Sequence, residues 1–217
     1  MIAQKSDGRR SAVLVSVVPS RDSSIGAAEA REELERLADT LGIESVREFS
    51  VQIREPNPKF LIGSGKLQEI AGEARELGAD CILFDDDLSP SQQRNWEAET
   101  GIATLDRHEL ILDIFGKHAT TREARLQVEL AQTEYALPRL TNAWPHLSKQ
   151  KGGTKGTRGE GETQLENDRR MVQDRIHRLK KLLDGVEKRR ATQRKRRDDN
   201  GIPSGAVVGY TNAGKSS

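Results

Sequence analysis

Apolar residues in the first half of the chain occur in short runs, which alternate with stretches whose apolar positions recur at helical spacing. We predict strands at the four apolar runs, at 12–18, 46–53, 80–84 and 102–105. We predict helices between them, at 26–41, 64–77 and from Ser89-Pro90 onward. Strands joined by helices of this length pair in parallel, so this order predicts an α/β layer fold with a small parallel sheet.

The same periodicity predicts which side chains are buried. In the helix at 64–77, the apolar positions three and four residues apart are Leu67, Ile70, Ala71, Ala74 and Leu77. Cys81 stands beside the apolar Leu83 and Phe84, which predicts a buried strand thiol. It is the single cysteine of the chain, so no intrachain disulfide can form, and a reducing compartment is favoured.

In the second half of the chain, apolar residues form narrow stripes along polar helices. One stripe, over 120–140, contains Leu126, Leu130 and Leu137. A second begins near Thr163 and follows a seven-residue repeat interrupted at Arg169; its members are Leu165, Val172, Ile176, Leu179, Leu183 and Val186. We therefore predict a long antiparallel helical hairpin over 119–199, following an N-terminal α/β subdomain over 1–118.

Composition adds information about partners and location. Charged residues make up 32% of the chain and aromatic residues 4%, which suits a small core with exposed, charged helices. The net charge of +1 hides an acidic segment at 29–35 and a basic segment at 188–197, so an anionic partner is not excluded. No apolar run reaches the roughly 18 residues of a membrane helix, and residues 1–10 lack the apolar stretch of a secretory signal. We expect a cytoplasmic monomer without a membrane span.

The last residues of the chain carry the most specific chemical pattern. The segment GYTNAGKSS at 209–217 fits G-x-x-x-x-G-K-S directly after an apolar run at 206–208, for which we predict a strand. Glycines let backbone N–H groups face phosphate oxygens, Lys215 reaches the β- and γ-phosphates, and the Ser216 hydroxyl binds Mg²⁺. The predicted phosphate site comprises Gly209, Tyr210, Thr211, Asn212, Ala213, Gly214, Lys215, Ser216 and Ser217.

We interpret residues 200–217 as a linker and the start of a truncated P-loop GTPase domain. Phosphoryl transfer also needs switch loops, a second carboxylate beside the magnesium and a base-reading segment, and none of these follows Ser217. We therefore expect the 217-residue chain neither to hydrolyse GTP nor to hold it tightly. Titration with labelled GTP checks this expectation, which submicromolar binding with turnover would contradict.

Two basic segments are candidates for RNA contact. Residues 149–162 hold five glycines, three lysines and one arginine, a combination that brings the backbone close to folded RNA and neutralises its phosphates. Residues 188–197 hold seven basic residues and no acidic one. The alternatives are a plain glycine-rich linker and a solvated helix end. The candidate rRNA contacts are Lys149, Lys151, Lys155, Arg158, Arg189, Arg190 and Arg194.

Weaker signals have ordinary explanations. The segment 63–66, GSGK, is too short for a phosphate loop and is interpreted as a turn before a capped helix, although an ATP site using Lys66 or the aspartates at 85–87 stays open. Those aspartates are interpreted as a solvated acidic loop rather than an Mg²⁺ site. Trp96 and Trp144 are interpreted as packing residues, and the four histidines have no partners at metal-ligand spacing.

With these segments in order, the chain resembles the HflX family of translational GTPases over nearly its whole length. The matching segments are FLIGSGKLQEI (60–70), FDDDLSPSQQRN (84–95), LILDIF (110–115), TREARLQVELAQ (121–132), GTRGEGETQLENDRR (156–170) and GYTNAGKS (209–216). Two positions depart from the family pattern: Glu160 stands where proline is expected, and Ser217 replaces threonine. The glutamate adds a negative charge to a loop that is predicted to contact RNA.

The resemblance implies an N-terminal α/β subdomain, a helical hairpin bearing the glycine-rich loop, and a Ras-like GTP-binding domain. It implies GTP and Mg²⁺ as cofactors, and K⁺ at Asn212, which resembles the asparagine that related GTPases use to hold a monovalent cation. It implies binding to the large ribosomal subunit and its rRNA near the peptidyl-transferase region, with splitting or rescue of stalled ribosomes under stress, and no DNA partner. The alternatives are a non-enzymatic ribosome- or RNA-binding module, and a front domain that also binds ATP.

Overall fold

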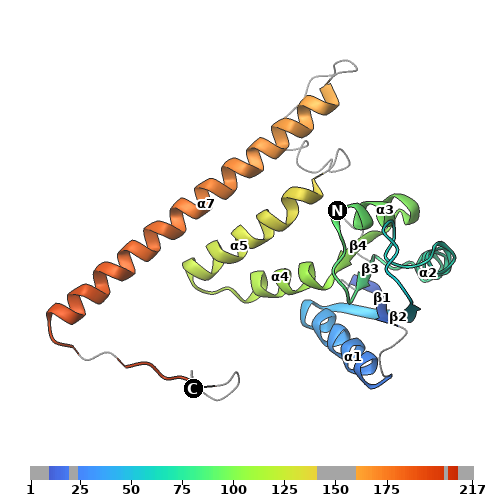
Figure 1. Ribbon diagram of the computed structural model, residues 1–217, viewed down its shortest axis with the longest axis horizontal. Helices are drawn as coiled ribbons and strands as arrows, with labels where there is room; N and C mark the ends of the chain where they lie inside the picture. The colour runs from blue at the N-terminus through green and yellow to red at the C-terminus, as the bar shows by residue number, and fades with distance from the viewer. Residues whose placement is uncertain (1–9, 20–23, 141–159, 203–204, 210–217) are drawn as a thin grey trace.

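The computed structural model describes residues 10–19, 24–140, 160–202 and 205–209, with side chains left undescribed at 19, 24–28 and 160–165. Figure 1 shows two parts, a sheet with helices on both sides and a long pair of helices that extends away from it. The chain passes from the first part to the second near residue 120, where α4 ends and α5 begins.

The sheet contains four parallel strands in the order β2-β1-β3-β4. The strands are β1 (Arg10–Pro19), β2 (Ile43–Ile53), β3 (Cys81–Phe84) and β4 (Ala103–Asp106). The central strand β1 pairs with β2 along its full length and with β3 over residues 12–15. The four predicted strands and the predicted α/β class with a parallel sheet are confirmed.

Helices cover both faces of the sheet and create two cores. The helices are α1 (Ser24–Leu41) and α4 (Arg107–His118) on one face, and α2 (Ser64–Glu76) and α3 (Pro90–Thr100) on the other. Because successive strand residues point to opposite faces, β1 gives Ala12 and Leu14 to the first core, and Val13 and Val15 to the second. Cys81 is buried in the first core as a free thiol, as predicted, and burial raises its pKa to about 12.

Helix α3 is held in place by its cap and by one tryptophan. The Ser89 side chain accepts a hydrogen bond from the Gln92 backbone, the Gln92 side chain accepts one from the Ser89 backbone, and Pro90 opens the helix. Trp96 is fully buried and donates from Nε1 to the Phe60 carbonyl at 2.8 Å. The predicted cap at Ser89 and the predicted packing role of Trp96 are confirmed.

Helix α4 was not anticipated, because it begins directly after a strand with no turn residues between them. Asp106 is the last residue of β4 and also the N-cap of α4, and its side chain accepts a hydrogen bond from the Glu109 backbone at 2.9 Å. Leu110 and Leu112 of the helix are buried. A residue that ends one element and caps the next leaves no loop for a sequence pattern to detect.

The second part of the molecule, which we call the arm, consists of α5 (Arg122–Ala136), the 3-10 turn η1 (Leu137–Arg139) and α7 (Glu160–Asp199). Helix α5 packs against α4 on one side and against α7 on the other. Helix α7 has 40 residues, which at about 1.5 Å per residue corresponds to about 60 Å. The predicted glycine-rich loop at 149–162 lies outside the described residues as far as residue 159, and its last three residues, 160–162, belong to α7 rather than to a loop.

Three local predictions need correction. Leu77 is 42% exposed rather than buried, because α2 ends at Glu76 and the chain turns away at Gly78, whose φ is 60°. The N-cap of α2 is Gly63, which has no side chain with which to cap it. Residues 206–208 form no strand, and Val208 is 92% exposed, because the described part of the chain offers no strand beside them.

Candidate functional site

The two long helices of the arm pack through the apolar stripe of α7. Ile176 and Leu179 are buried, at 8% and 0% exposure, and Val172, Leu183 and Val186 are half-buried beside them. These are the inward positions of the predicted heptad repeat. Leu165, the first member of that repeat, has an undescribed side chain.

Ion pairs flank this apolar contact and show the direction of the two helices. Arg190 near the end of α7 pairs with Glu123 at the start of α5. Earlier in α7, Arg175 pairs with Glu129, further along α5. The end of α7 therefore lies beside the start of α5, and Figure 1 shows that the two helices run in opposite directions along their contact.

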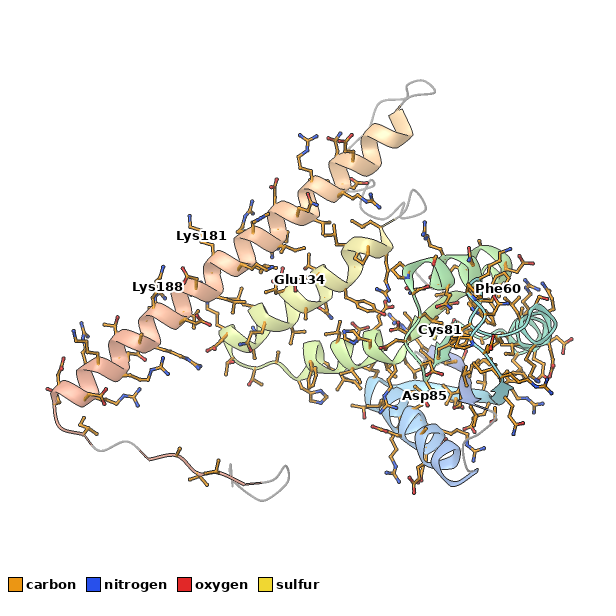
Figure 2. The ribbon with its side chains drawn as sticks, viewed as in Figure 1. Phe60, Cys81, Asp85, Glu134, Lys181 and Lys188 are labelled. Atoms are coloured by element: carbon orange, nitrogen blue, oxygen red, sulfur yellow. The ribbon has the colours of Figure 1, made fainter. Side chains whose placement is uncertain are left out.

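The outward face and the end of α7 carry exposed positive charge. Lys181 and Lys188 lie on the side of α7 that points away from α5 (Figure 2). Arg189 and Arg194 are exposed and form no ion pair within the described part of the chain. Arg190 is also a candidate rRNA contact, but its guanidinium binds Glu123, so the structure gives it a role within the arm.

The remaining sequence candidates lie outside the described residues. They are Lys149, Lys151, Lys155 and Arg158 of the glycine-rich loop, and Tyr210, Thr211, Asn212, Ala213, Gly214, Lys215, Ser216 and Ser217 of the phosphate loop. Gly209 is described, and it follows an extended segment in which Val207 and Val208 are exposed. Helix α7 therefore lies between the two predicted sites in the sequence, joined to one at each of its ends.

The arm meets the sheet at a buried carboxylate. The Asp106 side chain is 0% exposed and accepts hydrogen bonds from the Leu88 backbone N–H at 3.1 Å and from the Tyr135 hydroxyl of α5. The Tyr135 ring stacks on His108, with ring centroids 4.7 Å apart. Burial and the bond to Asp106 raise the pKa of Tyr135, so its hydroxyl stays protonated and acts as a donor.

Arg139 of η1 completes this junction. Its Nη2 atom lies 3.3 Å from Asp106 and donates to the Leu88 carbonyl at 2.7 Å. Its Nε atom donates to the Gln93 side chain of α3 at 2.8 Å, and its guanidinium lies over the Tyr135 ring, 3.4 Å from the centroid. We call Asp106, Tyr135, Arg139 and Gln93 the clasp.

A second carboxylate lies beside the clasp. Glu109 of α4 accepts a hydrogen bond from the Gln93 amide at 3.1 Å. Burial raises the pKa of Glu109 to about 7, and the negative charge of Asp106 adds to the shift. Glu109 and Gln93 border a cleft of about 410 Å³ between α3, α4 and the arm, which Tyr135 and Arg139 also line.

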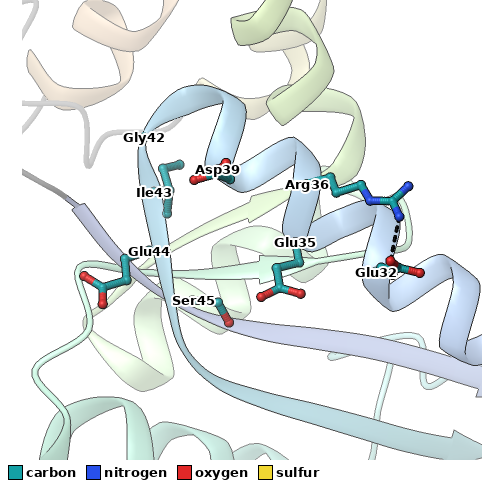
Figure 3. Close-up of a pocket in the computed structure, with 8 residues that line it drawn as sticks. All are labelled: Glu32, Glu35, Arg36, Asp39, Gly42, Ile43, Glu44 and Ser45. Atoms are coloured by element: carbon teal, nitrogen blue, oxygen red, sulfur yellow. Dashed lines mark hydrogen bonds and ion pairs between the residues drawn. The ribbon is translucent and has the colours of Figure 1, made fainter.

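The outer surface of α1 carries the opposite charge to the end of α7. An open groove with a volume of about 520 Å³ lies where α1 meets the start of β2. Figure 3 shows the residues that line it. Glu35, Asp39 and Glu44 line it, and its one arginine, Arg36, pairs with Glu32. The negative charge of this surface repels phosphate groups.

The weaker sequence candidates have structural partners. Lys66 pairs with Glu69 at 2.6 Å and lies 5.1 Å from the centre of the Phe49 ring. Asp85 pairs with Arg107 at 3.0 Å. In the part of the chain that the structure describes, no group of three or more potential ligands is placed to hold a metal ion. None of the described helices is apolar over a stretch long enough to cross a membrane.

Comparison with known proteins identifies the family. Two family models match in succession, GTP-binding GTPase N-terminal over residues 28–116 and GTP-binding GTPase Middle Region over residues 118–197. A GTPase HflX of Spirochaeta thermophila is 48% identical over 185 residues, which cover 85% of this chain and 45% of that protein. The chain belongs to the HflX family. The GTPase HflX of Escherichia coli is 43% identical over 210 residues, covering 97% of this HflX chain and 48% of the relative.

This HflX chain spans about half the length of the curated relatives it matches. Solved structures agree on the fold. The crystal structure of SsGBP in complex with GDP matches with a TM-score of 0.61 and 24% identity, over 84% of this chain and 46% of that one. A GTP-binding protein of Sulfolobus solfataricus in complex with GDP gives a TM-score of 0.56 at 23% identity, over 82% and 46%.

Sequence reasoning did not identify the clasp. Tyr135 and Arg139 are four residues apart, so they share one face of a helix, and this spacing is the signal that was available. Nothing in the sequence shows that their partner is Asp106, about 30 residues earlier, because that contact depends on how the arm packs against the sheet.

Proposed function

We propose that this HflX chain is the ribosome-docking half of a GTPase that binds the large ribosomal subunit and splits or rescues stalled ribosomes. The observation that carries the proposal is the succession of the two family matches, followed by the phosphate-loop pattern at 209–216. The first matched segment contains the sheet and its helices, and the second contains the arm.

In this proposal, the arm carries the rRNA contacts. The glycine-rich loop at one end of α7 approaches folded RNA, with Lys149, Lys151, Lys155 and Arg158 neutralising phosphates. Arg189 and Arg194 at the other end add contacts to the RNA backbone, while the acidic groove on α1 faces away from the RNA. Helix α7 then connects the RNA-binding loop to the nucleotide site across about 60 Å.

The nucleotide site in this proposal is the segment 209–217. Its backbone N–H groups and Lys215 bind the GTP phosphates, Ser216 binds Mg²⁺, and Asn212 holds K⁺. These residues supply phosphate binding and charge neutralisation, which are parts of phosphoryl-transfer catalysis. The alternative is a non-enzymatic module that binds ribosomal RNA alone.

Sedimentation with purified large ribosomal subunits tests the docking. We expect the 217-residue chain to co-sediment at about 50 mM salt and to be largely released at about 200 mM, because phosphate contacts are lost as counterions compete. The double variant Arg189→Gln/Arg194→Gln should bind about tenfold more weakly at the lower salt concentration. The matched control, Arg54→Gln/Lys59→Gln, removes the same charge from exposed positions near the sheet and should bind like the unmodified chain.

Two outcomes would count against this arrangement. Failure of the unmodified chain to co-sediment at low salt removes the docking proposal. An equal loss of binding in both double variants shows that net charge, rather than the end of α7, determines the affinity.

A further inference from the structure

The direction of α7 is set through a short chain of contacts. The main contacts of α7 are with α5 and η1. Helix α5 in turn packs on α4, and η1 packs on α3. The position of both ends of α7 relative to the sheet therefore depends on how α5 and η1 are attached to it.

Arg139 joins several elements at this attachment. It donates to the Leu88 carbonyl before α3, to the Gln93 side chain within α3, and to Asp106 at the end of β4. It also donates to the carbonyl of Tyr135 in its own helical segment, at 3.2 Å. A planar guanidinium that is bound in several directions allows little rotation, whereas apolar contacts tolerate sliding.

The charges at the clasp add a second constraint. Asp106 is fully buried, and within the described part of the chain Arg139 is the cation that pairs with it. A rotation of the arm that withdrew Arg139 would leave a buried carboxylate without its counter-charge, which is unfavourable. The Tyr135 hydroxyl donates to the same oxygen of Asp106 as Arg139 does. Helix α5 and the turn η1 are therefore both attached to this one carboxylate.

We propose that Arg139 is a positioning residue that fixes the angle between the arm and the sheet, and thereby the place to which α7 carries the glycine-rich loop. The role of that loop rests on the proposed function, whereas the angle itself does not. Arg139 acts through its fork of hydrogen bonds, so its positive charge alone is not sufficient. Lysine at this position keeps the charge beside Asp106 and loses the simultaneous bonds to Leu88 and Gln93.

The experiment measures the angle directly, in the full 217-residue chain. Spin labels are attached at Glu76→Cys in α2 and at Lys181→Cys in α7, both of which are exposed, and Cys81 is left in place because it is buried. Pulsed electron paramagnetic resonance then gives the distribution of label distances. We expect one narrow distribution in the unmodified chain, and in Arg139→Lys a distribution at least about twice as wide or shifted in its mean.

The matched control is Arg175→Lys, which alters an exposed ion pair between α5 and α7 and should leave the distribution unchanged. A second variant, Tyr135→Phe, removes the hydrogen bond that α5 donates to Asp106 and should widen the distribution without removing the charge pair. Thermal unfolding of each variant separates positioning from stability. If Arg139→Lys and Tyr135→Phe are folded and keep the narrow distribution, the positioning role is wrong. That result would stand whether or not the chain binds ribosomal subunits.

Discussion

Replacing Arg139 with methionine is expected to lower the free energy of unfolding by about 3–5 kcal/mol at pH 7. Methionine fills a similar space but leaves the carboxylate of Asp106, which is 0% exposed, without the cation that pairs with it. Removing one partner of a buried ion pair leaves an uncompensated buried charge, and this costs more than the pair contributes. Urea unfolding followed by tryptophan fluorescence measures the change, since Trp96 is fully buried beside Phe84.

Two further variants make this prediction specific. Arg175→Met breaks an exposed ion pair with Glu129 and should cost no more than about 1 kcal/mol. Adding Asp106→Asn to Arg139→Met should recover part of the loss, because the buried charge is then removed together with its partner. If Arg139→Met destabilises the chain no more than Arg175→Met does, Asp106 is not held as a buried charge.

The fold could be predicted from the sequence to the extent that its elements have local signals. The strands of the sheet are separated by helices with regular apolar spacing. Helix α3 begins at a capping box in which Pro90 directly follows the N-cap Ser89. Helix α4 also has a local signal, Asp106 followed three residues later by Glu109, but the signal is hard to separate from the strand because Asp106 both ends the strand and caps the helix. The segment at 206–208 has the composition of a strand, but composition alone cannot supply a neighbouring strand.

The residues of the candidate site likewise fall into two groups, those that the sequence reveals and those that only packing brings together. The phosphate loop and the basic segments are continuous in the sequence, so their residue types are visible without a structure. Arg190 shows the limit of that reasoning, because it belongs to a basic segment and yet binds Glu123 across the arm. The clasp brings together residues from β4, α3, α5 and η1, and only packing places them side by side.

Glu109 is expected to make the chain less stable as the pH rises from about 4.5 to about 7. Its pKa is raised to about 7 in the folded chain, first by burial and then by the negative charges of Asp106 and Asp113, while Gln93 and Arg139 oppose the shift. The folded state therefore binds the proton of Glu109 more tightly than the unfolded state does. The contribution of Glu109 to the free energy of unfolding is greatest below pH 4.5 and is lost as the pH rises through 7.

Glu109→Gln should remove this contribution of Glu109 to the pH dependence of stability. A shift of this size corresponds to a cost of up to about 3 kcal/mol for the ionised carboxylate, so the variant should be more stable than the unmodified chain by about 2–3 kcal/mol at pH 8. Near pH 4.5, where Glu109 is protonated in the folded chain, the two should unfold at nearly the same urea concentration. Glu35→Gln, on the exposed face of α1, serves as the control and should change stability by less than about 0.5 kcal/mol at either pH. Parallel pH profiles for Glu109→Gln and the unmodified chain would show that Glu109 is ionised at no cost, and that the cleft beside the clasp is as well solvated as the open groove on α1.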